Sequence, residues 1–422
     1  MIIRLAISNF LSIQRRIEIS FEAKPLKERD NLNVFSLSDH SLNLVKGIAF
    51  YGLNSAGKSN IIRSIAFMKN FVLNSFNELR ANEKIRIQPF KLSENNHVKP
   101  SLFEVEMIAG GSRYVYGFEL SSDRIHREWL DHCLKTTKRN YFTRNEDHLK
   151  IKDGFREGWN RKDFLRPNAL FLSTMAQLGE APVSTSIFGW FQNLIIISDL
   201  NYMTFLNQTA NRFEDSKYKS YLKKFFVHAN LGFEDIEIKK IQNEESNYQY
   251  LPDELRTLIL KRIPFQLQIS TIHNKYNDKG KLTGTERLDF KSHESQGTQK
   301  FFSFLGPTID SLINSKILII DELDSRLHPG LSQIIVEVFF SNLDNPNNAQ
   351  LIFSTHNLSI LKNKLLRRDQ IYYVFKNALQ STEIRTFLDF GVRSDSSYEA
   401  EFLKADFEGV VKLKGGQLKL FE

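Results

Sequence analysis

Two kinds of apolar pattern run along the chain, and each predicts a different kind of sheet. Apolar and polar residues alternate through four runs, at residues 2–10, 17–23, 101–109 and 112–120. A period of two predicts half-buried antiparallel strands, and the glycine pair 110–111 between the last two runs predicts a β-hairpin. From about residue 290 to 388, helical periods alternate with short runs that are wholly apolar. That order is typical of helices that cover both faces of a largely parallel sheet.

The middle of the chain is less regular and more helical. Its clearest pieces cover residues 189–200, 216–233 and 251–263. Two alternating runs around the polar turn 277–281 then predict a pair of strands between residues 264 and 290. We therefore expect one α/β domain that is interrupted by an insertion. The expected parts are residues 1–145, a mainly helical insertion at 146–265, residues 266–390 and a C-terminal tail at 391–422.

Length, charge and cysteine content limit the number of domains, the cellular compartment and the partners that the protein can have. At about 150 residues per domain, 422 residues suggest two or three units with ample core. Cys133 is the only cysteine, which excludes a disulfide framework or a zinc knuckle and suits a reducing cytosol. No apolar run approaches the roughly 20 residues that span a bilayer, and the alternating start does not resemble a signal sequence. We expect a cytoplasmic protein with no membrane partner. The net charge of +8 is compatible with nucleic acid and equally with ordinary solubility.

A glycine-framed lysine and serine follow the apolar strand pattern of residues 44–51. The segment reads GLNSAGKS, and an apolar-periodic helix pattern continues to about residue 77. Glycines let such a loop wrap so that backbone N–H groups and the helix N-terminus face phosphate oxygens. Lys58 would reach the β and γ phosphates, and the Ser59 hydroxyl would bind Mg²⁺. The alternative is a glycine-rich turn with a surface lysine. The nucleotide-binding residues that we assign are Gly52, Asn54, Ser55, Ala56, Gly57, Lys58, Ser59 and Asn60.

Two adjacent carboxylates follow the wholly apolar run Ile317–Ile320. A strand of that kind is buried on both faces, and its C-terminal end faces the ligand crevice of an open α/β sheet. Asp321 would hold the Mg²⁺ shell, while Glu322 would orient and deprotonate the water that attacks the γ phosphate. The alternative is a strand that runs into an acidic helix cap.

A histidine occupies the corresponding place after the apolar run Leu351–Phe353, behind Ser354 and Thr355. At a strand end beside a phosphate site, His356 can donate a hydrogen bond to a γ-phosphate oxygen and report its presence. The alternative is a structural hydrogen-bonding histidine.

Small polar residues also open the helix pattern that precedes the carboxylates. Ser295, Gly297 and Thr298 stand at its start, where such residues make a second anion site. One chain has little use for two such sites at a single triphosphate. We therefore expect the helix of one copy to close over the γ phosphate that the loop of another copy holds.

The order of these motifs resembles that of a known class of ATPase. It is similar to the Walker A, signature, Walker B with D-loop, and H-switch motifs of ABC-type ATPases, in the branch of SMC-like and RecF-type heads. The matching segments are GLNSAGKS, ESQGTQ, ILIIDELDSRLHPG and STHN. More narrowly, the chain resembles the AAA-type ATP-binding proteins of bacterial and archaeal abortive-infection and phage-defence modules. Further segments that carry this resemblance are NFLSI, PFKL, SRYVYGFEL, IHREWL and RRDQIYYVFK. The similarity runs from residue 1 to about 393 and is weakest in the middle.

The resemblance implies a fold and a set of roles. The expected fold is an α/β, ABC-type P-loop NTPase head with a mixed, largely parallel core sheet, an N-terminal antiparallel β lobe and a mainly helical insertion. Lys58 and Ser59 match the phosphate and Mg²⁺ residues, Asp321 and Glu322 match the Walker B pair, and His356 matches the switch histidine.

Four further positions carry roles from the resemblance. Asp324 matches the D-loop aspartate, which in the family meets the opposite subunit. Ser295 and Gly297 match the signature, although ESQGTQ departs from LSGGQ at several positions. Gln88, on a strand-like polar run, is the candidate glutamine that senses Mg²⁺, and a merely exposed polar residue is the alternative.

The resemblance also implies a function. ATP and Mg²⁺ are the expected cofactors, and the expected activity is an ATP hydrolysis that is slow or stimulated by a partner. ATP held between two copies would act as a switch in the sensor or regulatory ATPase of an anti-phage system with a separately encoded effector. The main alternative is a RecF/SMC-like DNA-repair ATPase that binds DNA in an ATP-gated manner. A transporter engine and a non-hydrolysing scaffold are further alternatives, and the choice between ATP and GTP stays open.

The insertion lacks the long heptad repeats of coiled-coil arms, which favours a compact lid or docking platform. Its segment 216–226 interleaves lysines with aromatic residues. This pattern fits a nucleic-acid surface, but a helix that buries its aromatic side chains and solvates its lysines is favoured.

Overall fold

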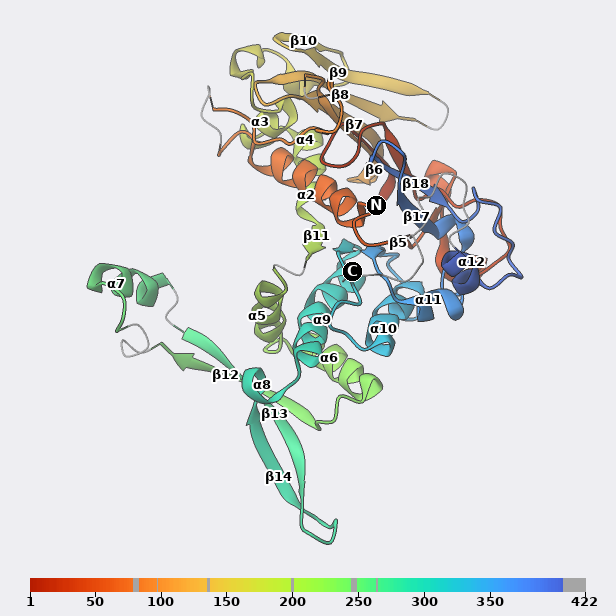
Figure 1. Cartoon of the computed structure of the whole chain (residues 1–422). Coiled ribbons are helices and arrows are strands. Elements are labelled where there is room, and N and C mark those ends of the chain that lie inside the picture. Colours follow the sequence, from red (N-terminus) through yellow and green to blue (C-terminus); the bar gives the residue numbers. More distant parts are fainter. Residues whose placement is uncertain are drawn as a thin grey trace, which may run out of the picture. The chain divides into compact units, whose positions relative to one another are not determined.

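The chain divides into two compact units that are described separately (Figure 1). The structure is a computed structural model that describes residues 1–78, 83–96, 98–134, 137–198, 201–243, 249–262 and 265–404. The first unit comprises Met1–Ile196, Ser311–Leu323 and the described residues from Val336 onward. The second comprises the described residues of 197–310 and 324–335. Residues 405–422 of the expected tail lie outside the described residues, and the expected four-part division stays a prediction.

A seven-stranded antiparallel sheet forms the β lobe of the first unit. Its strand order is β10-β9-β8-β7-β6-β1-β2. The strands are β1 Ile2–Ser8, β2 Ile17–Ser20, β6 Ser101–Ala109, β7 Ser112–Leu120, β8 Ile125–Cys133, β9 Lys138–Asn145 and β10 His148–Ile151. Gly110 and Gly111, with φ of 55° and 77°, form the turn between β6 and β7. The predicted pairing of the first two strands and the predicted hairpin are confirmed.

A second sheet of six strands carries the motifs. Its order is β11-β15-β16-β5-β17-β18. The strands are β5 Gly47–Tyr51, β11 Leu194–Ile197, β15 Ile317–Ile320, β16 Gln350–Ser354, β17 Ile371–Lys376 and β18 Thr382–Thr386. Strands β15, β16, β5 and β17 pair in parallel, whereas β18 pairs antiparallel with β17. The predicted mixed, largely parallel sheet is confirmed.

The single strand predicted over residues 44–51 is wrong, because the chain changes partners at Lys46. Strand β4 Leu42–Val45 pairs with β3 Val34–Leu37, whereas β5 begins at Gly47 in the six-stranded sheet. The Lys46 side chain is buried and its Nζ donates to Asn342 Oδ1 at 2.6 Å. A lysine inside an apolar run thus marks the point where the chain leaves one sheet for another.

Helix α2, Lys58–Asn74, joins the motif loop to the core of the first unit. It buries apolar residues at helical spacing, among them Ile61, Ile65, Met68 and Val72. Its Phe67 ring lies 5.0 Å from that of Phe103 on β6, measured between ring centroids. Figure 1 shows α2 with α3 Phe171–Gln177 and α4 Pro182–Gln192 beside the antiparallel sheet. The remaining helices of this unit are α1 Asp30–Asn33, α11 Leu358–Lys362 and α12 Tyr398–Lys404. Its 3₁₀ helices include η1 Ser38–His40 and η5 Arg368–Gln370.

A buried ionic network ties α3 to the β lobe. Glu128 on β8 and Arg144 on β9 are both fully buried. Glu128 accepts from the backbone N–H groups of Phe171 and Leu172 at 2.7 and 3.0 Å, and from the Tyr116 hydroxyl at 3.0 Å. Burial raises the pKa of Glu128, while the nearby Arg144 guanidinium opposes that rise. The carboxylate is satisfied by hydrogen bonds, as a buried charge requires.

The second unit contains helices and a three-stranded antiparallel sheet. The sheet has the order β12-β13-β14, with β12 Asp235–Gln242, β13 Phe265–Tyr276 and β14 Leu282–Asp289. The last two confirm the strand pair predicted around the turn 277–281. The helices within this unit are α5 Tyr202–Arg212, α6 Ser216–Ala229, α7 Asp253–Arg262 and α8 Phe290–His293. Helices α9 Gln296–Asn314 and α10 Pro329–Phe340 run from one unit into the other.

Helix α6 buries Tyr218, Leu222 and Phe226, which repeat every four residues, and it exposes its lysines. The interpretation of this segment as a packed helix is confirmed for Tyr218 and Phe226, whereas Tyr221 is exposed, with Lys224 Nζ 5.7 Å from its ring centre. Among the described residues, no helix combines the length and apolar character that crossing a bilayer demands.

Candidate nucleotide-binding site

The loop after β5 has the backbone geometry that the glycines predict. Residues 52–57 turn from the strand into α2, and Gly57 has a φ of 113°. A Cβ at this glycine would come within 2.1 Å of Thr382 Oγ1. Both the left-handed backbone and the close approach therefore demand glycine at this position. Ser55 is also left-handed, with a φ of 64°.

The lysine of the motif is folded over its own loop. Lys58 is 6% exposed, and its Nζ donates to the carbonyl oxygens of Gly52 and Leu53 at 2.9 and 3.1 Å. Such a buried ammonium is held by oxygen atoms of the loop itself. A phosphate that enters the loop offers the same ammonium stronger, charged acceptors.

Hydroxyl groups from two distant segments brace the back of the loop. Asn60 Nδ2 donates to Ser12 Oγ at 2.7 Å, and Ser12 Oγ lies 2.8 Å from Thr382 Oγ1. Thr382 Oγ1 donates in turn to the Ala56 carbonyl at 2.9 Å. The side chain of Asn60, which the sequence assigned to nucleotide binding, thus binds the Ser12 hydroxyl behind the loop. Sequence reasoning missed Ser12 and Thr382, because isolated hydroxyl residues in turns carry no motif.

The Mg²⁺ residues assigned from sequence meet at one edge of the parallel sheet. Ser59 Oγ donates to Asp321 Oδ1 at 3.2 Å, although 262 positions separate the two residues. Ser354 Oγ donates to the same Asp321 oxygen at 2.7 Å. Residue 59 follows β5, residue 321 follows β15, and residue 354 ends β16, three neighbouring parallel strands. Their C-terminal ends share one edge, where open α/β sheets bind ligands.

Ser354 also fixes the backbone of the second carboxylate. The Glu322 N–H donates to Ser354 Oγ at 2.7 Å, and the Leu323 N–H donates to the Ser354 carbonyl at 2.9 Å. Glu322 has a φ of 52°, which is unusual for a residue with a side chain, and that side chain is exposed. Backbone conformations of this cost persist where neighbouring contacts enforce them, often at functional sites. No motif could have assigned this role to Ser354, which the sequence marked only as a strand end.

His356 lies just beyond the same strand end, with an exposed side chain. The turn that carries it is held on both sides. Tyr51 at the end of β5 donates its hydroxyl to the Asn357 carbonyl at 3.0 Å, and Asn357 Oδ1 caps α11 by accepting from Ser359 N at 2.9 Å. His356 is therefore placed at the sheet edge that carries Asp321, and its phosphate-sensing role stays a prediction.

Gln88 lies on a segment that forms no strand, so the strand-like interpretation of that run is wrong. The segment is held instead by single backbone bonds. The Leu11 N–H donates to the Gln88 carbonyl at 2.8 Å, and the Phe90 N–H donates to Asn9 Oδ1 at 3.1 Å. The Gln88 side chain is exposed, and its contact with Mg²⁺ stays a prediction.

The signature and D-loop residues lie together in the second unit. Ser295 Oγ accepts from the Thr298 N–H at 3.0 Å and so caps α9, while its side chain remains exposed. A Cβ on Gly297 would approach the Arg326 carbonyl to 2.7 Å. The glycine thus lets the first turn of α9 pack against the turn that contains Asp324, whose carbonyl accepts from Leu327 N at 3.1 Å. The partner-facing roles of these residues stay predictions.

The donor set at the sheet edge fits Mg²⁺ together with a nucleotide. One hydroxyl and one carboxylate oxygen, from Ser59 and Asp321, are the hard ligands that Mg²⁺ takes from a protein when phosphates and waters complete its shell. Among the described residues no group of three or more His, Cys, Asp or Glu side chains is arranged to hold a metal by itself.

The fold and the site define a P-loop nucleotide-binding protein of the α/β class. Residues 48–174 and 189–362 match a family model described as "AAA domain, putative AbiEii toxin, Type IV TA system". The match covers more than half of the chain, and the chain belongs to this family of AAA-domain proteins. The resemblance inferred from the motifs is thereby confirmed at the level of the family.

The chain is also similar to the SMC head domain from Thermotoga maritima, with 16% sequence identity and a TM-score of 0.36. That comparison covers 91% of this chain and 98% of the other. None of the curated proteins compared with the sequence matches it.

Proposed function

We propose that the chain binds and hydrolyses ATP with Mg²⁺, and that bound ATP pairs two copies of it to regulate a separately encoded effector in defence against phage. The observation that carries the proposal is the junction of Ser59, Asp321 and Ser354 beside the Lys58 loop. Segments from the two ends of the domain meet there with the oxygen donors that a Mg²⁺-bound triphosphate needs.

Each residue has a defined task in the proposed reaction. Lys58 exchanges the Gly52 and Leu53 carbonyls for β- and γ-phosphate oxygens, while loop N–H groups and the N-terminus of α2 hold the remaining negative charge. Ser59 and Asp321 would hold Mg²⁺, which neutralises charge on the β and γ phosphates when it is bound. Glu322 orients the attacking water and accepts its proton.

Pairing of two copies follows from the second anion site. The N-terminus of α9 carries an exposed Ser295, and small residues there admit a phosphate oxygen. The exposed side chains of Glu322 and His356 likewise suit a site that a second copy completes. Closure by ATP and opening after hydrolysis then give the switch its two states.

The family description supports a role beside a second protein. It names a putative toxin of a toxin–antitoxin system, and such a system consists of more than one component. We place this chain in the regulatory position, because its motifs serve nucleotide turnover. An ATP-gated clamp on DNA is the competing function.

Affinity purification of the tagged chain from its native host, before and during phage infection, tests the proposed function. We expect a second, separately encoded protein to co-purify, in an amount that changes between wild type and Lys58→Ala. Recovery of this chain alone under both conditions contradicts the effector proposal. Salt-sensitive, ATP-dependent binding of duplex DNA without a protein partner favours the clamp instead.

A further inference from the structure

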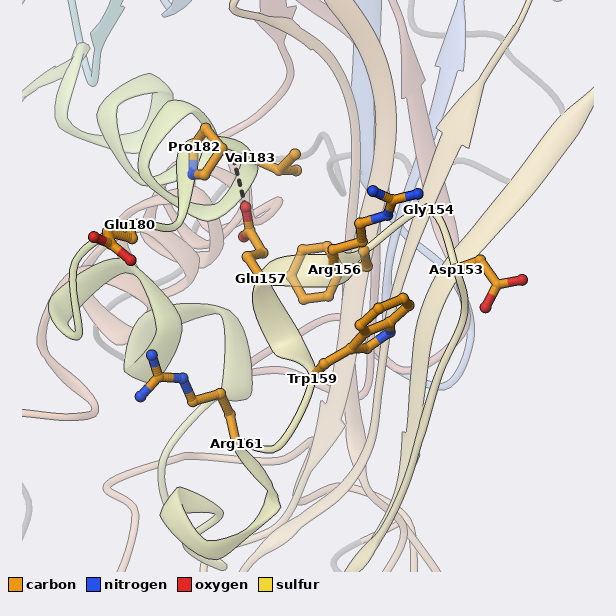
Figure 2. A pocket seen from close by; sticks show the side chains of 10 residues that line it. Asp153, Gly154, Arg156, Glu157, Trp159, Arg161, Glu180, Pro182 and Val183 are labelled. Atoms are coloured by element: carbon orange, nitrogen blue, oxygen red, sulfur yellow. Dashed lines mark hydrogen bonds between the residues drawn. The ribbon is translucent and has the colours of Figure 1, made fainter.

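A second concave site lies in the first unit, built from residues separate from those assigned to ATP. The cavity has a volume of about 510 Å³ and is lined by residues within 153–161 and 180–183 (Figure 2). The segment 153–161, which contains the 3₁₀ helix η2 Arg156–Gly158 and precedes η3 Lys162–Phe164, forms one side, and the N-terminus of α4 forms the other. Pockets of about 300–1,000 Å³ hold small ligands, so one nucleotide unit fits this volume.

An exposed aromatic ring forms part of the cavity wall. Trp159 is 46% exposed, and the Arg156 guanidinium carbon lies 5.9 Å from the centre of its ring. Phe164 is 43% exposed, and the Arg161 guanidinium carbon lies 6.0 Å from its ring centre. Figure 2 shows Trp159 and Arg161 projecting from the same loop. Of these two pairs, Trp159, Arg156 and Arg161 line the cavity, so a flat base can stack on the indole ring and a phosphate can bind an arginine.

The segment around the cavity is basic, whereas the cavity lining itself carries two arginines and three carboxylates. Residues 148–166 contain six lysines and arginines against three acidic residues, a net of three positive charges. One acidic residue, Glu157, is already engaged, since its two oxygens accept from Val183 N and Ser184 N at 2.9 Å each. Asp153 and Glu180 also line the cavity. Their carboxylates can accept hydrogen bonds from the amino groups of a base.

We propose that this Trp159 cavity binds a nucleotide unit of a single-stranded nucleic acid, with a base stacked on Trp159 and flanking phosphates at Arg156 and Arg161. A single strand is specified because a base within a duplex has no free face for an indole ring. The site needs no ATP, and the proposal does not depend on the proposed ATPase function. It gives the chain a means of contacting nucleic acid through its β lobe.

Fluorescence titration of the full chain tests this proposal with defined probes. The probes are oligodeoxycytidylate and oligocytidylate of about 12 nucleotides, whose bases carry an amino group, and a duplex of the same length. Trp129 and Trp190 are only 8% and 7% exposed, so quenching by an oligonucleotide reports mainly Trp159. We expect quenching together with a rise in probe anisotropy, and Trp159→Ala is expected to weaken binding roughly tenfold. Trp159→Phe should keep most of the affinity and lose the quenching, while the duplex should bind more weakly.

Matched variants separate this site from its surroundings. Tyr276→Ala removes another exposed aromatic residue, on β13, and should bind like wild type. Lys58→Ala should also bind normally, which distinguishes this proposal from a failure of the ATPase proposal. The logarithm of the binding constant falls linearly with the logarithm of the salt concentration. Neutralising Arg156 and Arg161 should make that slope less steep by roughly 0.7 for each phosphate that is no longer bound. Equal affinity of Trp159→Ala and wild type, equal binding of duplex and single strand, or no quenching by either oligonucleotide would overturn the proposal.

Discussion

Replacing Lys58 with alanine is expected to weaken ATP binding by at least about a hundredfold. The buried ammonium donates to the Gly52 and Leu53 carbonyl oxygens at distances that a phosphate oxygen can take over directly. Hydrogen bonds to charged groups contribute about 1.5–3 kcal/mol each, so the removal of two such bonds accounts for the effect. Isothermal titration calorimetry with a non-hydrolysable ATP analogue and Mg²⁺ measures it.

Arg63→Ala is the matched control for this variant. Arg63 is an exposed cation on the same helix, and its guanidinium makes a long hydrogen bond of 3.5 Å to Asn60 Oδ1. Its replacement should leave ATP affinity within about twofold, as for a surface position. Full ATP affinity in Lys58→Ala would contradict the assignment of the phosphate loop.

Glu322→Gln is expected to lower ATP hydrolysis by about 10²- to 10⁴-fold while ATP affinity stays within a few-fold of wild type. The amide keeps the size of the side chain and the backbone bond to Ser354, but it cannot accept the proton of the attacking water. The carboxylate is exposed, so its replacement leaves the packing of the sheet edge unchanged. Single-turnover phosphate release and calorimetry, run side by side, separate chemistry from binding.

Asp344→Asn provides the control for a change of charge alone. Asp344 is an exposed carboxylate whose backbone N–H, not its side chain, makes the hydrogen bond to Ser341 Oγ. Hydrolysis by this variant should match wild type. Equal rates for wild type and Glu322→Gln would remove Glu322 from the mechanism and leave a nucleotide-binding scaffold.

Local motifs allowed the central part of the site to be predicted from sequence. The loop 52–59 and the segment 317–322 are continuous, and each combines a strand pattern with the residues that follow it. Because parallel strands end at one sheet edge, the predicted strands already imply that Ser59 and Asp321 approach each other, as the 3.2 Å hydrogen bond shows.

Contacts between distant single residues could not be predicted in the same way. Ser12 and Thr382 are 370 positions apart, and neither belongs to a periodic pattern or a spaced motif. The passage of the chain from one sheet to the other at Lys46 could not be predicted, because the apolar run continues on both sides of this residue. The segment of Gln88 was mispredicted for a similar reason. Its polar run suggested a strand, but single hydrogen bonds to distant residues hold it instead of strand pairing.

Ser295 and Asp324, the two residues proposed to contact a second copy, both lie in the second unit. Ser295 caps α9 and Asp324 lies in the turn that packs against the start of α9, where Gly297 allows the Arg326 carbonyl to approach closely. A partner that moves this unit would therefore move both of the proposed contacts to a second copy at once. In the proposed function, an effector would act on these contacts without touching the Lys58 loop.

Analytical ultracentrifugation of Glu322→Gln with Mg²⁺ and ATP tests the central claim most directly. Slow hydrolysis should trap the closed pair, and we expect twice the 49.1 kDa mass of one chain with ATP and the single-chain mass without it. Adding Ser295→Asp keeps a good helix cap but places a negative charge against the γ phosphate, so it should restore the single-chain mass. A single-chain mass for Glu322→Gln while calorimetry shows bound ATP would contradict the proposed pairing of two copies by ATP.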